Sequence, residues 1–166
     1  MGERGTPVKP GVAVLTQQVE HMFFGQFHHN IDDKGRLTIP ARYRDLLAAE
    51  EAYVMRGFDQ NLMVFPASAF ERISRRVEQM NLTDPKVRML RRLFFAGASQ
   101  LEIDKTGRIL LPQFLRQNYI KDSSAVVVGV GNYFEIWTPE RWAGQEGLLH
   151  EDSLAHMFAD LMLSSE

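Results

Sequence analysis

The 166-residue sequence contains no cysteine. This absence excludes disulfide bonds, cysteine-ligated zinc, iron–sulfur clusters and a thiol nucleophile. Long apolar runs are also missing, since none approaches the roughly 18–20 residues that a membrane-spanning helix needs. The first 21 residues lack the basic start, apolar middle and cleavage site of a secretory signal peptide. We therefore expect a cytoplasmic protein with no membrane partner.

Motifs typical of catalysis, phosphate binding or metal binding are also missing. No nucleophile elbow and no phosphate-binding loop holds the serine, histidine and acidic residues together. His28 and His29 are adjacent on a predicted strand and therefore point to opposite faces, while His150 and His156 match no zinc-binding spacing. We therefore expect no enzyme activity, no catalytic residues, no metal site, no cofactor and no small-molecule substrate.

The composition is that of a folded globular protein, but its charge is unevenly distributed. Hydrophobic residues make up 45% of the chain, and 19 Lys and Arg against 21 Asp and Glu give a net charge of −2. Residues 140–166 hold six acidic side chains and one arginine, a net charge of −5, so residues 1–139 carry +3. A basic body with an acidic tail is compatible with anion binding on one surface.

A repeated segment is the most informative feature of the sequence. Residues 31–44 (IDDKGRLTIPARYR) align without a gap with residues 103–116 (IDKTGRILLPQFLR). The two segments share an Ile, an Asp, a Gly, an Arg, a Pro and a final Arg. With a one-residue shift, the apolar pattern of residues 52–66 recurs at 125–139. The chain is therefore predicted to be a tandem duplication.

Periodicity and turn residues predict a strand, turn, strand, helix and hairpin in each copy. We predict strands within 23–31, 37–39, 52–56, 62–65, 100–103, 109–111, 125–130 and 134–137, and helices at 40–47, 70–80, 87–94, 112–118 and 153–163. Asp84 or Thr83 is expected to cap the helix that follows Pro85. The last helix is expected to dock its apolar face on the body.

These elements predict an α+β fold. Each copy has too few strands to bury its own apolar faces, so the copies are expected to pack on each other and to close a small barrel from exchanged hairpins. The expected parts are a flexible N-terminal extension at 1–21, a first repeat at 26–68, a helical insertion at 69–96, a second repeat at 97–141 and an acidic helical tail at 142–166.

The repeat contains two short motifs, which we call box one (residues 32–36, DDKGR) and box two (residues 104–108, DKTGR). Asp32 and Asp104 are each four residues before an arginine and can pair with it to brace a turn. The turn glycines, Gly35 and Gly107, can supply a positive φ. This structural role accounts for these four residues.

Bracing does not account for Lys34 together with Arg36. Two cations at one turn tip repel each other unless an anion lies between them. Phosphate meets that need, and an arginine can also recognise guanine, so Lys34 and Arg36 are candidates for nucleic-acid contact. The family resemblance given below favours DNA as that ligand.

Other basic residues are weaker candidates for DNA binding. Arg108 can contact DNA or only brace its turn, and Lys105 is one position before Thr106, which replaces the lysine of box one. Arg42 and Arg44, on the helix after Pro40, can neutralise phosphates or be solvated. A further set on the middle helix is expected to face solvent or to contact the acidic tail of another subunit: Lys86, Arg88, Arg91 and Arg92.

Residues 22–25 (MFFG), the two boxes and the prolines that follow them resemble the MraZ family of bacterial transcriptional regulators, over about residues 22–142. The resemblance implies an AbrB-like swapped-hairpin barrel of the double-psi type. It implies sequence-specific binding to double-stranded DNA in the nucleoid and ring-shaped homo-oligomers.

The function implied by the resemblance is regulation of the division and cell-wall gene cluster, including the protein's own promoter, through short direct repeats. An alternative function is that of an antitoxin-like or scaffold protein that uses the same barrel to bind a protein partner.

Overall fold

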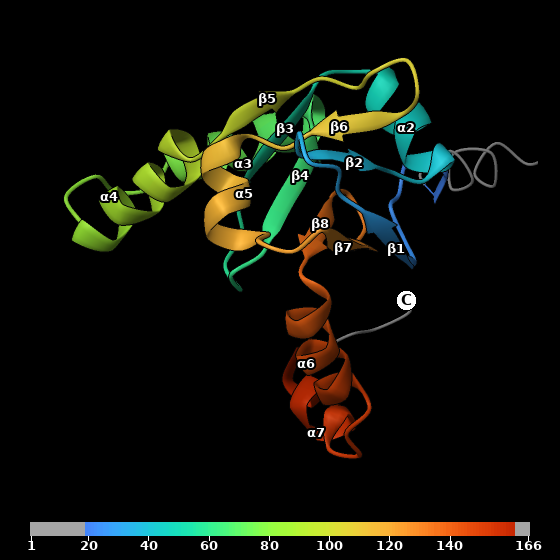
Figure 1. Ribbon diagram of the computed structural model, residues 1–166. Coiled ribbons are helices and arrows are strands. Elements are labelled where there is room, and N and C mark those ends of the chain that lie inside the picture. Colours follow the sequence, from blue (N-terminus) through green and yellow to red (C-terminus); the bar gives the residue numbers. More distant parts are fainter. Residues whose placement is uncertain (1–18, 162–166) are drawn as a thin grey trace, which may run out of the picture.

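The computed structural model describes residues 19–161, and its two halves repeat one order of elements (Figure 1). The first half comprises β1 (Gln26–Asn30), β2 (Arg36–Thr38), α2 (Ala41–Ala48), β3 (Ala52–Arg56), β4 (Leu62–Pro66) and α3 (Ala67–Glu78). The second half comprises β5 (Ser99–Leu101), β6 (Arg108–Leu110), α5 (Gln113–Tyr119), β7 (Ser124–Gly129), β8 (Phe134–Trp137) and α6 (Pro139–Leu149). The predicted α+β class and tandem duplication are confirmed.

Two further pairs of elements complete the chain. The helix α4 (Pro85–Arg91) and the π-helical turn η1 (Arg92–Ala96) connect the halves, and α7 (Leu154–Phe158) and the 3-10 turn η2 (Ala159–Leu161) follow α6. Asp84 caps α4 by accepting a hydrogen bond from the Lys86 backbone N–H.

The large sheet has the antiparallel strand order β1-β7-β8-β4-β3-β5. Replacing each strand by its equivalent in the other half reverses this order, which indicates a pseudo-two-fold axis between β8 and β4. The hairpins are exchanged as predicted, because β1 pairs with β7 and β5 pairs with β3.

The strands β2 and β6 pair only with each other and form a separate two-stranded sheet. They meet the large sheet through two single bridges, Ile31 with Leu37 and Ile103 with Ile109. Pro40 and Pro112 lack a backbone N–H and follow these strands closely, so neither strand extends further. The described strands therefore form two sheets rather than one closed barrel.

The main core lies between the large sheet and the β2–β6 pair. Its residues come in equivalent pairs from the two halves, such as Leu37 with Ile109 and Ile39 with Leu111, all of them buried. Val54 of β3 belongs to this core. Because successive strand residues point to opposite faces, its neighbour Met55 lies on the outer face of the sheet. There α3 and η1 cover one half of the sheet, and Trp142 of α6 covers the other.

The C-terminal region differs from the sequence prediction in two respects. Residues 142–166 were expected to form a helical tail, but α6 was not predicted as a separate helix within it. In addition, α7 is not docked by an apolar face: Met157, Phe158 and Leu161 are 62%, 46% and 65% exposed. The physical reason is that α6 and α7 extend away from the sheets (Figure 1). The two last apolar residues of the predicted helix, Met162 and Leu163, lie outside the described residues.

The predicted N-terminal extension lies largely outside the described residues, which begin at Val19. Arg42 donates hydrogen bonds to the carbonyl oxygens of Val19 and Met22, at 2.9 and 3.2 Å, and its guanidinium stacks on Phe24. Residues 19–24 are therefore attached to α2. Among residues 19–161, no helix is both long enough and apolar enough to cross a membrane.

Candidate nucleic-acid interface

Box one forms a tight turn between β1 and β2, organised by the Asp32 carboxylate. Its Oδ1 accepts hydrogen bonds from the backbone N–H groups of Lys34 and Arg36, at 3.0 and 2.8 Å. Its Oδ2 accepts one from Arg36 Nε at 2.6 Å. The Gly35 N–H donates to the Asp32 carbonyl at 3.0 Å, with φ of +83° at Gly35. The predicted pairing of Asp32 with Arg36 is therefore present.

Box two repeats this geometry between β5 and β6. Asp104 Oδ1 accepts hydrogen bonds from the backbone N–H groups of Thr106 and Arg108, both at 2.9 Å, and Oδ2 accepts one from Arg108 Nε at 2.8 Å. The Thr106 hydroxyl donates a further hydrogen bond to Oδ1 at 2.8 Å. Gly107 has φ of +79°. Thr106 thus strengthens the turn at the position where box one carries Lys34.

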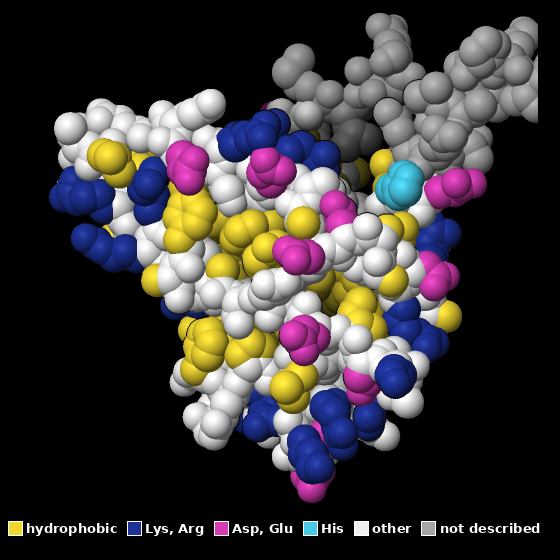
Figure 2. Space-filling view, turned by 90° about the horizontal axis from the view of Figure 1, so that it is seen from above, with side chains coloured by type: hydrophobic (Ala, Val, Ile, Leu, Met, Phe, Trp, Pro, Cys, Tyr) yellow, Lys and Arg dark blue, Asp and Glu magenta, His cyan; other side chains and the backbone are white. Residues whose placement is uncertain are grey.

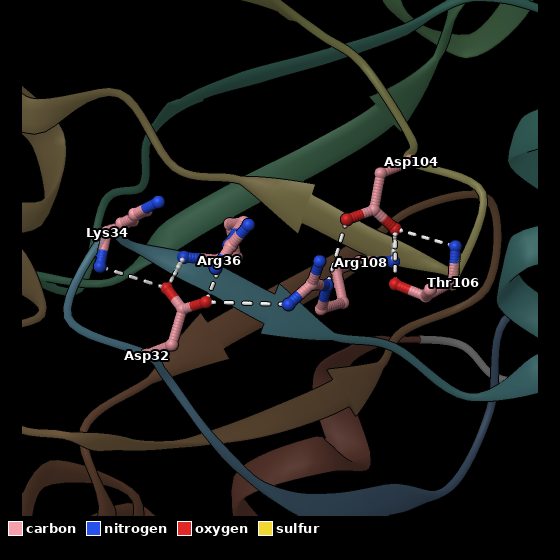
Figure 3. Close-up of polar contacts among 6 residues, drawn as sticks. All are labelled: Asp32, Lys34, Arg36, Asp104, Thr106 and Arg108. Carbon is pink, nitrogen blue, oxygen red and sulfur yellow. Dashed lines mark hydrogen bonds and ion pairs between the residues drawn. The ribbon is translucent and has the colours of Figure 1, made fainter.

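The pairing of β2 with β6 places the two boxes side by side (Figure 3). Arg108 Nη1 lies 3.6 Å from Asp32 Oδ2, so the Arg108 guanidinium lies between the carboxylates of both boxes. Among residues 19–161, Arg36 donates to one carboxylate only, that of Asp32. Arg108 is therefore the more fully neutralised of the two arginines.

Hydrogen bonding keeps both carboxylates ionised. The N–H of Arg36 holds the pKa of Asp32 below its usual value, and the N–H of Arg108 holds the pKa of Asp104 well below its usual range. Hydrogen bonds from the arginine side chains act in the same direction. At neutral pH each box therefore contains an ionised aspartate, Asp32 or Asp104, hydrogen-bonded to the arginine of the same box.

Lys34 is the exposed cation of box one. Its side chain points away from the Asp32 carboxylate (Figure 3), and Arg36 binds Asp32 only through N and Nε. Within residues 19–161, the outer nitrogens of Arg36, Nη1 and Nη2, make no hydrogen bond. The turn therefore presents an ammonium group and two guanidinium nitrogens to a ligand.

The remaining predicted DNA ligands lie in different surroundings. Lys105 is exposed within box two. Arg42 is engaged by the backbone of residues 19–22 and by Phe24. The half-buried side chain of Arg44 lies against Gly107 of box two, and Arg116 of α5 lies against Gly35 of box one. Arg116 was not predicted as a site residue, although it is the final arginine shared by the two repeats.

The basic side chains of the middle helix lie far from the boxes in the fold. Figure 2 shows Lys and Arg side chains at the left edge, where α4 lies. Arg88 donates hydrogen bonds to the carbonyl oxygens of Leu82 and Thr83, and Arg91 stacks on Phe95. Two of the four predicted basic residues therefore have partners within this chain.

Comparison with known proteins identifies the family. A family model described as "MraZ protein, putative antitoxin-like" matches residues 22–93 and again residues 94–164. Similar curated proteins include the "Transcriptional regulator MraZ" of Roseiflexus castenholzii, 44% identical over 138 residues, which covers 83% of this chain and 94% of that protein. The protein of the same name from Thermomicrobium roseum is 43% identical over 143 residues, covering 85% of this chain and 100% of that protein. That of Herpetosiphon aurantiacus is 48% identical over 121 residues, covering 73% of this chain and 84% of that protein. Since the family model matches twice across the same two repeats that carry the boxes, this chain belongs to the MraZ family.

Proposed function

We propose that this chain is a transcriptional regulator that binds double-stranded DNA through the tip of box one. The observation that carries the proposal is the exposed Lys34 beside the half-buried Arg36, whose outer nitrogens make no hydrogen bond within residues 19–161, on a turn fixed by Asp32. A lysine contributes a point charge and an arginine a planar fork, which suit phosphate and guanine. The names of the similar proteins support the same function.

Box two contributes less to DNA binding in this proposal. Arg108 is held between two carboxylates, and Thr106 donates its hydroxyl to Asp104. Lys105 remains as an exposed cation that can add a phosphate contact. Arg42 and Arg44 act mainly within the protein, Arg42 by holding residues 19–24 and Arg44 by covering box two.

The resemblance supports a more specific form of this function. The chain regulates the division and cell-wall gene cluster, including its own promoter, in the cytoplasm at the nucleoid. It recognises short direct repeats as a ring of identical subunits and acts without catalysis, cofactor or small-molecule substrate.

Surface chemistry supports the association of identical subunits. The tail exposes apolar side chains on α6, α7 and η2 among acidic residues, including Leu148, Leu149 and Met157. The exposed arm formed by α4 is basic and carries Met89, which is 68% exposed. Opposite charge and exposed apolar side chains on two separate parts of the molecule, α4 and the tail, favour head-to-tail contacts.

The alternative is an antitoxin-like or scaffold function, and the exposed apolar side chains of α7 are the observation that favours it. The two functions differ in the residues on which they depend. A protein partner held on α7 does not require Lys34 or Arg36, whereas DNA binding does.

The experiment is a DNA-binding titration of the Arg36→Ala variant at several salt concentrations, roughly 50 to 200 mM. The probe is a labelled duplex of the region upstream of this gene. Affinity should fall, and the dependence of log K on log[salt] should become less steep by about 0.9 for each phosphate that the variant no longer neutralises.

The matched control is Arg75→Ala, which removes the same charge from an exposed i,i+4 pair with Glu71 on α3. It should leave both affinity and salt dependence close to those of the unmodified protein. Equal affinity and slope for Arg36→Ala would eliminate the proposed role of box one and leave the protein-partner alternative.

A further inference from the structure

The glycines of both boxes are buried, although each lies at a turn tip. The side chain that covers Gly35 belongs to Arg116 on α5, and the one that covers Gly107 belongs to Arg44 on α2. In both cases the covering arginine comes from the opposite repeat. The arrangement is therefore crossed: the helix of each repeat reaches the DNA-binding turn of the other.

The arginine side chains lie directly over the glycines. A Cβ built on Gly35 would lie 2.6 Å from Arg116 Cζ, and one built on Gly107 would lie 2.6 Å from Arg44 Nε. The positive φ of each turn favours glycine, and a side chain at either position would also displace the arginine packed on it.

A backbone hydrogen bond crosses between the repeats at the same place. The Leu111 N–H donates to the Gly35 carbonyl at 2.9 Å, and the Ile39 N–H donates to the Gly107 carbonyl at 3.3 Å. A proline follows each of these donors, and the arginine comes four residues after that proline, one helical turn later. In each repeat one short segment, residues 39–44 or 111–116, therefore both donates a backbone hydrogen bond to the turn of the opposite repeat and packs an arginine on it.

The contact made by Arg44 is one of packing rather than hydrogen bonding. Its Nε is buried and has no hydrogen-bond partner within residues 19–161. The side chain of Arg44 therefore meets Gly107 by packing of its Cδ and Nε over the glycine.

We propose that Arg44 and Arg116 are positioning residues that hold the DNA-binding turn of the opposite repeat. Arg116 fixes box one, and with it the direction of Lys34 and Arg36, while Arg44 fixes box two. The role differs from the phosphate contact predicted for Arg44 from the sequence. Its relevance to DNA rests on the proposed function, but the crossed support of the turns does not.

The first test measures amide hydrogen exchange by NMR in Arg116→Ala and Arg44→Ala. Arg116→Ala should raise exchange at Gly35 and Arg36 by about tenfold or more and leave Gly107 and Arg108 nearly unchanged. Arg44→Ala should give the reverse pattern. General destabilisation would raise exchange in both boxes alike, and that result, or loosening of the box in the mutated residue's own repeat, would overturn the proposal.

The second test separates positioning from direct phosphate contact by comparing alanine with methionine. Methionine keeps part of the unbranched stem and removes the charge. In Arg116→Met, the exchange rates of the box-one amides should lie between those of the unmodified protein and those of Arg116→Ala. If Arg116→Ala does not fold, Arg116→Met is used to test whether exchange rises in box one and stays nearly unchanged in box two. Its affinity for the upstream duplex should fall less than that of Arg116→Ala.

The salt dependence of binding should stay unchanged in Arg44→Met and Arg116→Met. A slope reduced by about 0.9 would show that the arginine itself neutralises a phosphate, and would overturn the positioning role. The two proposals can fail separately. If each arginine variant raises amide exchange in the opposite box while Arg36→Ala binds DNA with unchanged affinity, DNA binding through box one is refuted and the crossed support is retained. Normal exchange together with a weakened Arg36→Ala variant would do the opposite.

Discussion

At the scale of single residues, the turn of box two holds Asp104 firmly in its ionised form. Hydrogen bonds from Arg108 N–H, together with those from Thr106, lower its pKa well below the 3.8 of an unperturbed aspartate. The folded state therefore binds the proton less well than the unfolded state does. The stability that Asp104 contributes is complete above about pH 4 and is lost as the pH falls through the folded pKa.

Asp104→Asn should consequently lower the melting temperature at pH 6, and the difference from the unmodified protein should shrink as the pH falls below about 4. Thermal unfolding measured between about pH 3 and 7 checks this. Asp160→Asn on the exposed turn η2 is the control, since Asp160 accepts no hydrogen bond within residues 19–161, and its difference from the unmodified protein should not vary in this way. A constant difference for Asp104→Asn would contradict the role assigned to the turn.

The box geometry could be predicted from sequence because it is local. The aspartate, the glycine and the arginine lie within five residues, so their spacing alone fixes which groups can pair. The partners of Arg44 and Arg116 could not be predicted in this way, because they lie in the other repeat. The shared final arginine was visible in the repeat alignment, but its contact depends on how the two copies pack.

At the scale of elements, α6 is attached to the body mainly through Trp142. Its Nε1 donates a hydrogen bond to Gln26 Oε1 at 2.7 Å, and its ring lies 5.7 Å from that of Trp137, centroid to centroid. With Val126 and Val128 these residues form a separate apolar cluster on the outer face of the sheet. Arg141 of α6 adds hydrogen bonds to the carbonyl oxygens of Gln60 and Tyr119, at 2.8 and 3.4 Å, so this cluster and Arg141 together attach the C-terminal region to the body.

Trp142→Ala should lower the melting temperature by about 6–12 °C, because removing a large buried aromatic costs about 3 kcal/mol and each kcal/mol corresponds to roughly 2–4 °C in a chain of this size. Thermal unfolding followed by circular dichroism measures the change. Met157→Ala on α7, a residue 62% exposed, should change the melting temperature little. Similar effects from both variants would show that α6 is not anchored by Trp142.

The helix α6 escaped the sequence prediction because its pattern is weak. It contains Gly144 and Gly147, which disfavour helix, and it buries Trp142 alone, so no apolar stripe marks it. The opposite error occurred at α7, where a clear apolar stripe predicted docking. An apolar face shows that a helix needs a partner, but it does not show whether that partner belongs to the same chain.

At the scale of the whole molecule, the proposed ring presents successive box-one tips in the same orientation, because head-to-tail contacts repeat one rotation. Direct repeats spaced by about one helical turn, ~10 bp, should then place successive sites on one face of the DNA. Inserting ~5 bp between two repeats should weaken binding more than inserting ~10 bp, since half a turn moves one site to the far face. Titration of the three duplexes measures this. A footprint over a single inverted repeat that tolerates both insertions would exclude the ring on direct repeats and leave DNA binding itself in place.

The exchanged strand order also determines when the chain can fold during its synthesis. Because Gln26 of β1 pairs with Val128 of β7, the first repeat has no complete sheet until most of the second has left the ribosome. Closing such long loops is slow and leaves apolar strand faces uncovered in the nascent half-chain. In exchange, the meeting of the two halves takes place within one polypeptide, so its rate does not depend on how many copies the cell contains.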